Sequence, residues 1–226
     1  MLQEQNSKTT HFDWDNLKRQ ITDTNSVRLR IDVGLSYKPP NAIEWLKTCK
    51  DTLIIAVEPV YSSFESTKNH LIPLITSTQG RNNSLILINA ALDNIDDCEL
   101  RTINISNIDP GASSLFEISN NGDVTHSHEE RIQVLSFKKL LDQIDWKRYN
   151  LIDYLKLDTQ GKDLDIMKSC EPYHDKIQLL EIETTTNNCY HGTPNQQEIV
   201  DYLKNSKFEF VRYSGDAADH VYRYKR

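Results

Sequence analysis

The first residues that could do chemistry lie at the end of a short apolar run. The run Arg28 to Val33 carries Asp32 near its end and is followed at once by Gly34. A glycine after a buried strand lets the backbone approach a ligand closely, and an aspartate there can accept hydrogen bonds from a ligand amine or hydroxyl. This turn is therefore a candidate ligand site, although Asp32 could instead cap the helix that follows.

A second carboxylate, Glu58, ends the next apolar run. In nucleotide-binding α/β sheets, an acid at this place holds the hydroxyls of a ribose. Ser36 and Pro39 stand where the later glycines of a G-x-G-x-x-G fingerprint would be, so tight packing against a pyrophosphate is not expected. The two acids therefore favour a nucleoside ligand without a diphosphate over a dinucleotide.

Histidines supply further candidate groups. His126 and His128 would point the same way on a strand and, with Glu129, could bind a divalent metal. A polar loop with titrating histidines is the favoured interpretation, because no third ligand is fixed, and no metal is indicated. His191 follows the fifth apolar run and is expected on the ligand side of the sheet, either as an acceptor contact or in loop packing.

Short apolar runs that alternate with amphipathic segments must position these residues. Such runs are typical of strands buried on both faces, and the alternation predicts an α/β fold: a doubly wound, mostly parallel, seven-stranded sheet with helices on both faces. The expected strands are Arg28 to Val33, Leu53 to Val60, Ser84 to Leu92, Ile152 to Leu157, Ile177 to Ile182, Phe208 to Tyr213 and Val221 to Tyr224.

Capping residues and prolines mark five expected helices. Ser62 and Glu65 have capping-box spacing for the second helix, which Pro73 should end. The other helices are expected to begin at Pro40, at the N-cap Ser136, at Lys162 and at the N-cap Thr193, with Pro194 in the first turn and Gln196 at the third helical position.

One region interrupts this alternation. Residues 98–130 first alternate apolar and polar side chains and then become polar, which predicts a β-hairpin and loop inserted between the third and fourth core strands. Residues 28–226 are assigned to one ligand-binding domain and residues 1–27 to a polar, helical extension, since 226 residues suit a single sizeable domain.

Composition excludes several classes of protein. The net charge of -7 works against a large nucleic-acid surface. The four cysteines form no Cys-x-x-Cys pair, so neither a zinc knuckle nor a disulfide framework is indicated. No stretch approaches the roughly 20 apolar residues that span a bilayer. We expect a cytoplasmic protein without a nucleic-acid or membrane partner. The oligomeric state stays open, with a homodimer among the alternatives.

Five ordered motifs resemble those of the FkbM-type methyltransferases. They are Asp32-Val33-Gly34, Val57-Glu58-Pro59, Asn89-Ala90-Ala91-Leu92, the stretch Leu155 to Gly161 with Asp163, and Leu180 to Glu183. The stretch Lys156 to Gly161 is the most specific of them. The resemblance implies a class I, Rossmann-like fold that uses S-adenosylmethionine and methylates a hydroxyl, commonly on a sugar or glycan or another small molecule.

The resemblance also implies roles for single residues. Glu58 would hold the ribose of the cofactor, the segment 89–93 would flank the adenine, and Asp158 would face the methyl group. The chain departs from its relatives between Ser36 and Pro40, where another glycine is usual. The expected cofactor contacts are Asp32, Gly34, Ser36, Glu58, Pro59, Asn89, Ala90, Asp93 and Asp158.

Methyl transfer to a hydroxyl needs an acceptor held in line with the methyl group and a base for its proton. The candidate catalytic residues are Asp158, Glu183 and His191, and the sequence does not choose among them. Two alternatives remain: a non-catalytic protein that binds S-adenosylmethionine, and a nicotinamide oxidoreductase. The incomplete glycine fingerprint argues against the second.

Overall fold

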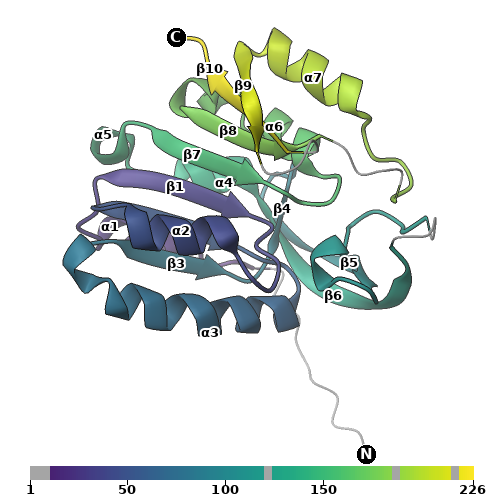
Figure 1. Ribbon diagram of the computed structural model, residues 1–226, viewed down its shortest axis with the longest axis horizontal. Helices are drawn as coiled ribbons and strands as arrows, with labels where there is room; N and C mark the ends of the chain where they lie inside the picture. Colours follow the sequence, from purple (N-terminus) through teal and green to yellow (C-terminus); the bar gives the residue numbers. More distant parts are fainter. Residues whose placement is uncertain (1–10, 120–123, 185–188, 215–218) are drawn as a thin grey trace, which may run out of the picture.

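The computed structural model describes residues 11–119, 124–184, 189–214 and 219–226. Seven strands form one sheet in the order β3-β2-β1-β7-β8-β10-β9 (Figure 1). All neighbours pair in parallel except β10, which is antiparallel to both β8 and β9. The strands are β1 (Arg28–Val33), β2 (Thr52–Val57), β3 (Ser84–Ile88), β7 (Ile152–Leu157), β8 (Leu179–Glu183), β9 (Phe208–Ser214) and β10 (Asp219–Tyr224). The predicted seven-stranded, mostly parallel sheet is confirmed.

Helices cover both faces of this sheet, as predicted. Side chains of a strand alternate between its faces; Ile54 and Ala56 therefore pack under α2 (Pro40–Thr48) and α3 (Tyr61–Ser77). Ile31 and Ile55 belong to the larger core on the other face. The helices with side chains in that core are α1 (Trp14–Thr22), α4 (Phe137–Asp142), α5 (Trp146–Tyr149), α6 (Asp163–Ser169) and α7 (Gln196–Asn205).

Part of the N-terminal segment joins the main core. Trp14, Leu17 and Ile21 of α1 are buried in the same cluster as the strands. The described residues also include the short 3-10 helices η1 (Gln79–Arg81), η2 (Pro110–Ala112) and η3 (Glu171–Lys176). None of the helices that the structure describes is long and apolar enough to cross a membrane.

A second, three-stranded sheet lies beside the first. It contains β4 (Ala91–Asp93), β6 (His126–Ser136) and β5 (Cys98–Ser106) in that order, and β5 and β6 form the expected antiparallel hairpin. The prediction of one strand from Ser84 to Leu92 is wrong, because β3 ends at Ile88 and the chain crosses to the second sheet. At the break, Asn89 Nδ2 donates to the carbonyl oxygens of Glu58 and Pro59, at 2.9 and 3.1 Å, which turns the chain out of the ladder.

Three boundaries, in two of the predicted helices, are also wrong. The second helix starts at Tyr61 without a side-chain cap from Ser62, and it runs through Pro73 to Ser77. The fifth helix has Asn195 as its N-cap rather than Thr193, because Asn195 and Glu198 make a complete capping box. A capping box satisfies two backbone donors at once, which favours the later start.

Candidate active site

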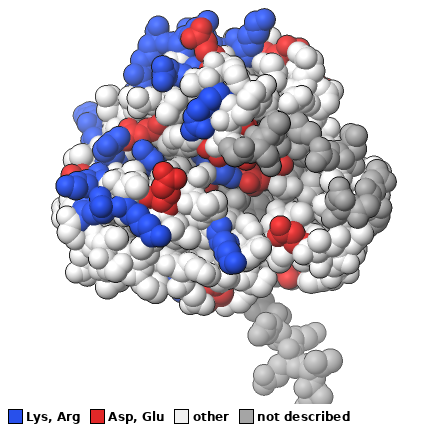
Figure 2. Space-filling view, in the orientation of Figure 1, with Lys and Arg blue, Asp and Glu red and all other residues white. Residues whose placement is uncertain are grey.

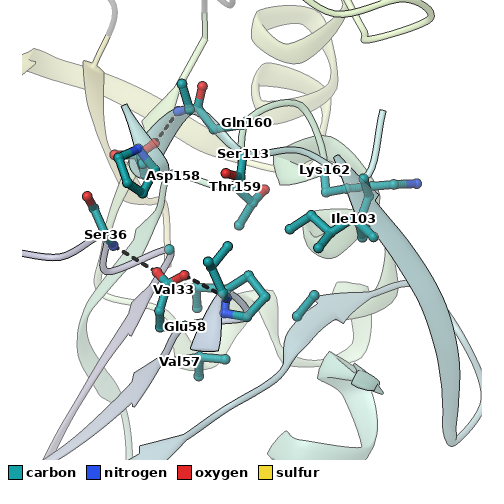
Figure 3. Close-up of a pocket in the computed structure, with 18 of the residues that line it drawn as sticks. Val33, Ser36, Val57, Glu58, Ile103, Ser113, Asp158, Thr159, Gln160 and Lys162 are labelled. Carbon is teal, nitrogen blue, oxygen red and sulfur yellow. Dashed lines mark hydrogen bonds between the residues drawn. The ribbon is translucent and has the colours of Figure 1, made fainter. Parts of the chain in front are cut away.

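A cavity of about 360 Å³ lies where the strand order reverses, at the carboxyl ends of β1, β2 and β7 (Figure 3). This crevice is where open α/β sheets bind ligands, and the volume suits a small molecule. The segment that contains η2 lines the other side. The lining residues are Val33, Gly34, Ser36, Val57, Glu58, Pro59, Val60, Ala90, Ala91, Leu92, Ile103, Asp109, Pro110, Gly111, Ala112, Ser113, Leu115, Asp158, Thr159, Gln160 and Lys162.

The turn after β1 forms the floor of this cavity. Gly34 has a φ of 82°, and a Cβ there would lie 1.7 Å from the backbone oxygen of Asp158. The glycine is thus required by the close approach of β7. Ser36 also adopts a positive φ, of 55°. Its N–H donates to Glu58 Oε2 at 2.8 Å, and its carbonyl accepts from Thr67 Oγ1 at 2.6 Å, so these bonds stabilise the left-handed backbone without a glycine.

Glu58 stabilises this turn from β2. Its carboxylate accepts the N–H of Ser36 with Oε2 and the N–H of Val60, at 2.9 Å, with Oε1 (Figure 3). Burial raises the pKa of Glu58 to about 7, although these backbone hydrogen bonds lower it. A carboxylate oxygen can accept two hydrogen bonds, so Glu58 can still accept hydroxyls of a ligand while it holds the turn.

Asp32 lies behind the turn and does not line the cavity. Its Oδ2 accepts the N–H of Ala42, at 3.1 Å, in the first turn of α2. Burial raises the pKa of Asp32 to about 7, while the charge of Lys156 lowers it. The structure therefore puts Asp32 in the helix-capping position that the sequence left as its alternative.

The residues expected around an adenine divide into two groups. Ala90 lines the cavity with Val60, Leu92 and Ile103, which together form an apolar wall suited to a planar ring. Pro59 is also part of the lining. Asn89 and Asp93 are not: Asn89 is exposed, and buried Asp93 pairs with Arg101 and with Lys162, the latter at 3.2 Å.

Asp158 directly follows β7 and lines the cavity, and Figure 3 shows it across the view from Ile103 of the apolar wall. Its N–H donates to the Val33 oxygen at 3.0 Å. Oδ2 pairs with Lys156 Nζ at 2.8 Å, and Oδ1 accepts from Gln160 Nε2 at 2.8 Å. The side chain keeps 31% of its surface exposed. Asp158 is thus an oriented carboxylate that both the cavity and solvent can reach.

Glu183, at the end of β8, is joined to Asp158 through one amide. Gln160 Nε2 donates to Glu183 Oε2 at 3.0 Å as well as to Asp158. Burial, followed by the charges of Asp158, Asp163 and Asp219, raises the pKa of Glu183 to about 9, against the effect of Lys156. Glu183 therefore carries a proton at neutral pH.

The three histidines that the sequence offers as candidates, His126, His128 and His191, lie outside the cavity lining. His191 is exposed, and its backbone N–H donates to the Glu117 oxygen at 2.9 Å. His128 is exposed on β6, where Nε2 lies 3.1 Å from Glu130 Oε1, and His126 is exposed on the same strand. Across the parts of the chain that the structure describes, no three His, Cys, Asp or Glu side chains are arranged to hold a metal ion.

Three residues of this site had no assigned role in the sequence analysis. Lys156 and Gln160 stand two positions before and after Asp158 in the most specific motif, and strand periodicity would have placed Lys156 beside that carboxylate. Tyr190 precedes His191 and is buried, and its hydroxyl lies 2.7 Å from Gln160 Oε1. No sequence signal relates Tyr190 to Gln160, because their contact joins distant segments.

Comparison with known proteins gives one family and several distant folds. A family model described as "Methyltransferase FkbM domain" matches residues 32–210. A Streptococcus pneumoniae protein proposed to be a tRNA (m1A22) methyltransferase is 11% identical, over 95% of this chain and 71% of its own, with a TM-score of 0.46. A precorrin-6y C5,15-methyltransferase from Geobacter metallireducens is 9% identical, over 97% and 92% of the two chains, with a TM-score of 0.42.

An rRNA methylase from Streptococcus thermophilus is similar at the same level: 9% identical, over 97% of this chain and 98% of its own, with a TM-score of 0.42. Likeness this distant says nothing about the substrate of this chain. No curated protein matches the sequence significantly.

Replacing Gly34 by alanine should destabilise the fold strongly. The new Cβ would collide with the Asp158 backbone, and the positive φ adds strain, so we expect a loss of at least about 3 kcal/mol of unfolding free energy in urea titrations. Gly80→Ala is the matched control, because a Cβ there meets nothing within 4 Å. Equal stability of the two variants would contradict the packing of β7 against this turn.

Proposed function

The chain belongs to the FkbM family of methyltransferases, and from this premise we propose that it transfers a methyl group from S-adenosylmethionine to a hydroxyl of a sugar, a glycan or a similar small acceptor. The observation that carries the proposal is the Asp158 carboxylate, fixed by Lys156 and Gln160 at the edge of the cavity. A base in that position can accept the proton of an attacking hydroxyl.

The chemistry of the cavity lining supports S-adenosylmethionine as its ligand. Glu58 offers carboxylate oxygens to a ribose diol, the apolar wall of Val60, Ala90, Leu92 and Ile103 suits the adenine, and Ser36 adds a hydroxyl near Gly111. When bound, S-adenosylmethionine supplies an electrophilic methyl group on a sulfonium centre. The turn at Gly34 and the end of β7 would then lie on either side of its methionine portion.

Asp158 is the best supported of the three candidate bases. Its carboxylate is oriented at the edge of the cavity by Lys156 Nζ and Gln160 Nε2, each at 2.8 Å. Glu183 has a pKa raised to about 9, so at neutral pH it donates hydrogen bonds rather than accepting a proton. Neither Glu183 nor His191 belongs to the cavity lining, but Glu183 is joined to Asp158 through Gln160, whereas His191 is exposed. We assign proton acceptance to Asp158 and hydrogen bonding of the acceptor to Glu183.

The charge around the site favours an acceptor rich in hydroxyls. Figure 2 shows acidic side chains near the centre of the viewed face, whereas Lys and Arg lie mostly towards its upper and left parts. Asp158, Glu183 and Asp219 lie at the ends of neighbouring strands. Carboxyl groups exchange hydrogen bonds with hydroxyls, and none of these three side chains offers a positive charge to a phosphate. This supports a neutral polyol such as a sugar over a phosphorylated acceptor.

Asp158→Asn should abolish most turnover while the protein still binds cofactor. Loss of the base should lower kcat/KM by about 10²–10⁴-fold, with the affinity for S-adenosylhomocysteine within a few-fold of wild type. The assay measures S-adenosylhomocysteine released with a panel of neutral glycans. Asp153→Asn, the same change on an outer residue of β7, is the control. Cofactor binding without product from any acceptor would instead favour the non-catalytic alternative.

Cofactor affinity should depend on pH through Glu58. The pKa of Glu58 is raised to about 7, and the ionised form accepts ribose hydroxyls more strongly, so binding should strengthen as pH rises through 7. Calorimetry with S-adenosylhomocysteine should give an affinity on the order of tenfold weaker at pH 6 than at pH 8. Glu58→Gln should bind weakly at both values. An affinity that does not change with pH in wild type would count against Glu58 as the ribose ligand.

A further inference from the structure

Gln160 occupies an unusual position between the two carboxyl groups. Its φ is 54°, a left-handed conformation that is uncommon for a residue with a side chain. Ser114 Oγ donates to its backbone oxygen at 2.7 Å, and its Nε2 donates to Asp158 at 2.8 Å and to Glu183 at 3.0 Å. A strained residue persists where its surroundings fix it, and strain of this kind concentrates at functional sites.

The orientation of the Gln160 amide is determined by its partners. The side chain has two N–H donors on one atom and an acceptor on the other. Turning it round would place its oxygen against both carboxyl groups. The Tyr190 hydroxyl lies 2.7 Å from Gln160 Oε1 and donates to it. The Asp158 carboxylate, which can only accept, therefore fixes the orientation of the amide, and the Tyr190 hydroxyl supplies a donor to the Gln160 oxygen in that orientation.

Tyr190 also touches the wall of the cofactor cavity. Its hydroxyl lies 2.8 Å from the carbonyl oxygen of Ala112, which belongs to η2 and lines the cavity. The hydroxyl has one proton for the two acceptors, Gln160 Oε1 and Ala112 O. A shift of Ala112 therefore changes the strength of the hydrogen bond from Tyr190 to Gln160.

Backbone hydrogen bonds join the segment around Tyr190 to residues 117–119, in the loop that follows η2. Tyr190 forms an isolated antiparallel bridge with Ile118, and the N–H of Ser119 donates to the Cys189 oxygen at 2.7 Å. The N–H of His191 donates to Glu117. The segment after β8 is thus bonded to the inserted loop that continues from η2, so a movement of this loop reaches Tyr190 directly.

We infer that Gln160 and Tyr190 are positioning residues that link occupation of the cofactor cavity to the arrangement of the Asp158 and Glu183 carboxyl groups. The inference deepens the proposed function and rests on it. A ligand that contacts η2 changes how the Tyr190 hydroxyl shares its hydrogen bond between Ala112 O and Gln160 Oε1. The polarisation of the Gln160 amide changes as a result, and with it the strength of the hydrogen bonds from Nε2 to both carboxyl groups. The acceptor site is thereby completed when cofactor is bound.

The test follows the ionisation of Glu183 and needs no acceptor. Carbon-13 NMR of glutamate carboxyl groups reports its titration, with the signal assigned by its loss in Glu183→Gln. The charged or titrating groups around Glu183 are Asp158, Asp163, Asp219, Lys156 and Tyr190. S-adenosylhomocysteine is the probe, because it occupies the cavity without the sulfonium charge. Spectra are compared for wild type, Tyr190→Phe and Gln160→Met, with Tyr202→Phe as a matched control on α7.

We expect S-adenosylhomocysteine to move the Glu183 titration by on the order of half a pH unit in wild type and Tyr202→Phe. Tyr190→Phe should show less than half of this displacement, although it still binds the probe. In Gln160→Met, Glu183 should titrate at higher pH even without the probe, because its ionised form loses the hydrogen bond donated by Gln160. An equal displacement in wild type and Tyr190→Phe, or none in wild type that binds the probe, overturns the inference alone. Failure of wild type to bind the probe overturns the proposed function as well.

Discussion

The contact on which the site depends is the backbone of Asp158 against Gly34. The N–H of Asp158 donates to Val33, the N–H of Gly34 donates to Val57, and the Cβ that Gly34 lacks would overlap the Asp158 carbonyl. Three strand ends are therefore joined within one turn. This contact makes the floor of the cavity, and it also fixes the carboxylate of Asp158 at the edge of that cavity.

Buried carboxyl groups organise the loops around this contact. Glu58 accepts backbone N–H groups of Ser36 and Val60, Asp32 accepts that of Ala42, and Asp163 accepts that of Thr159 at 3.0 Å. Burial raises the pKa of each above its usual value. The hydrogen bonds to backbone N–H groups offset part of the free-energy cost of burying these carboxyl groups. Each of them fixes a turn that lines or supports the cavity. Of the three, only Glu58 also lines the cavity and can contact a ligand there.

Much of the fold could be predicted from periodicity, because buried parallel strands are continuous apolar runs. The switch of the chain from β3 to β4 could not, since both halves of that run are apolar and the break depends on the contact of Asn89 with Glu58 and Pro59. The two acids at strand ends look alike in sequence. Only the packing of α2 shows that Asp32 caps a helix while Glu58 faces the cavity. The link from Tyr190 to Gln160 joins distant segments and leaves no local signal.

The central claim is that the acceptor atom is a hydroxyl oxygen whose proton passes to Asp158. It is tested most directly with S-adenosylmethionine that carries a carbon-13 methyl group, incubated with the protein and a panel of neutral sugars and glycans. Mass spectrometry and NMR of the product then locate the label. We expect a labelled methyl ether on a sugar hydroxyl. Label found on a nitrogen or a carbon atom would contradict it, as would cofactor binding without transfer to any of the sugars.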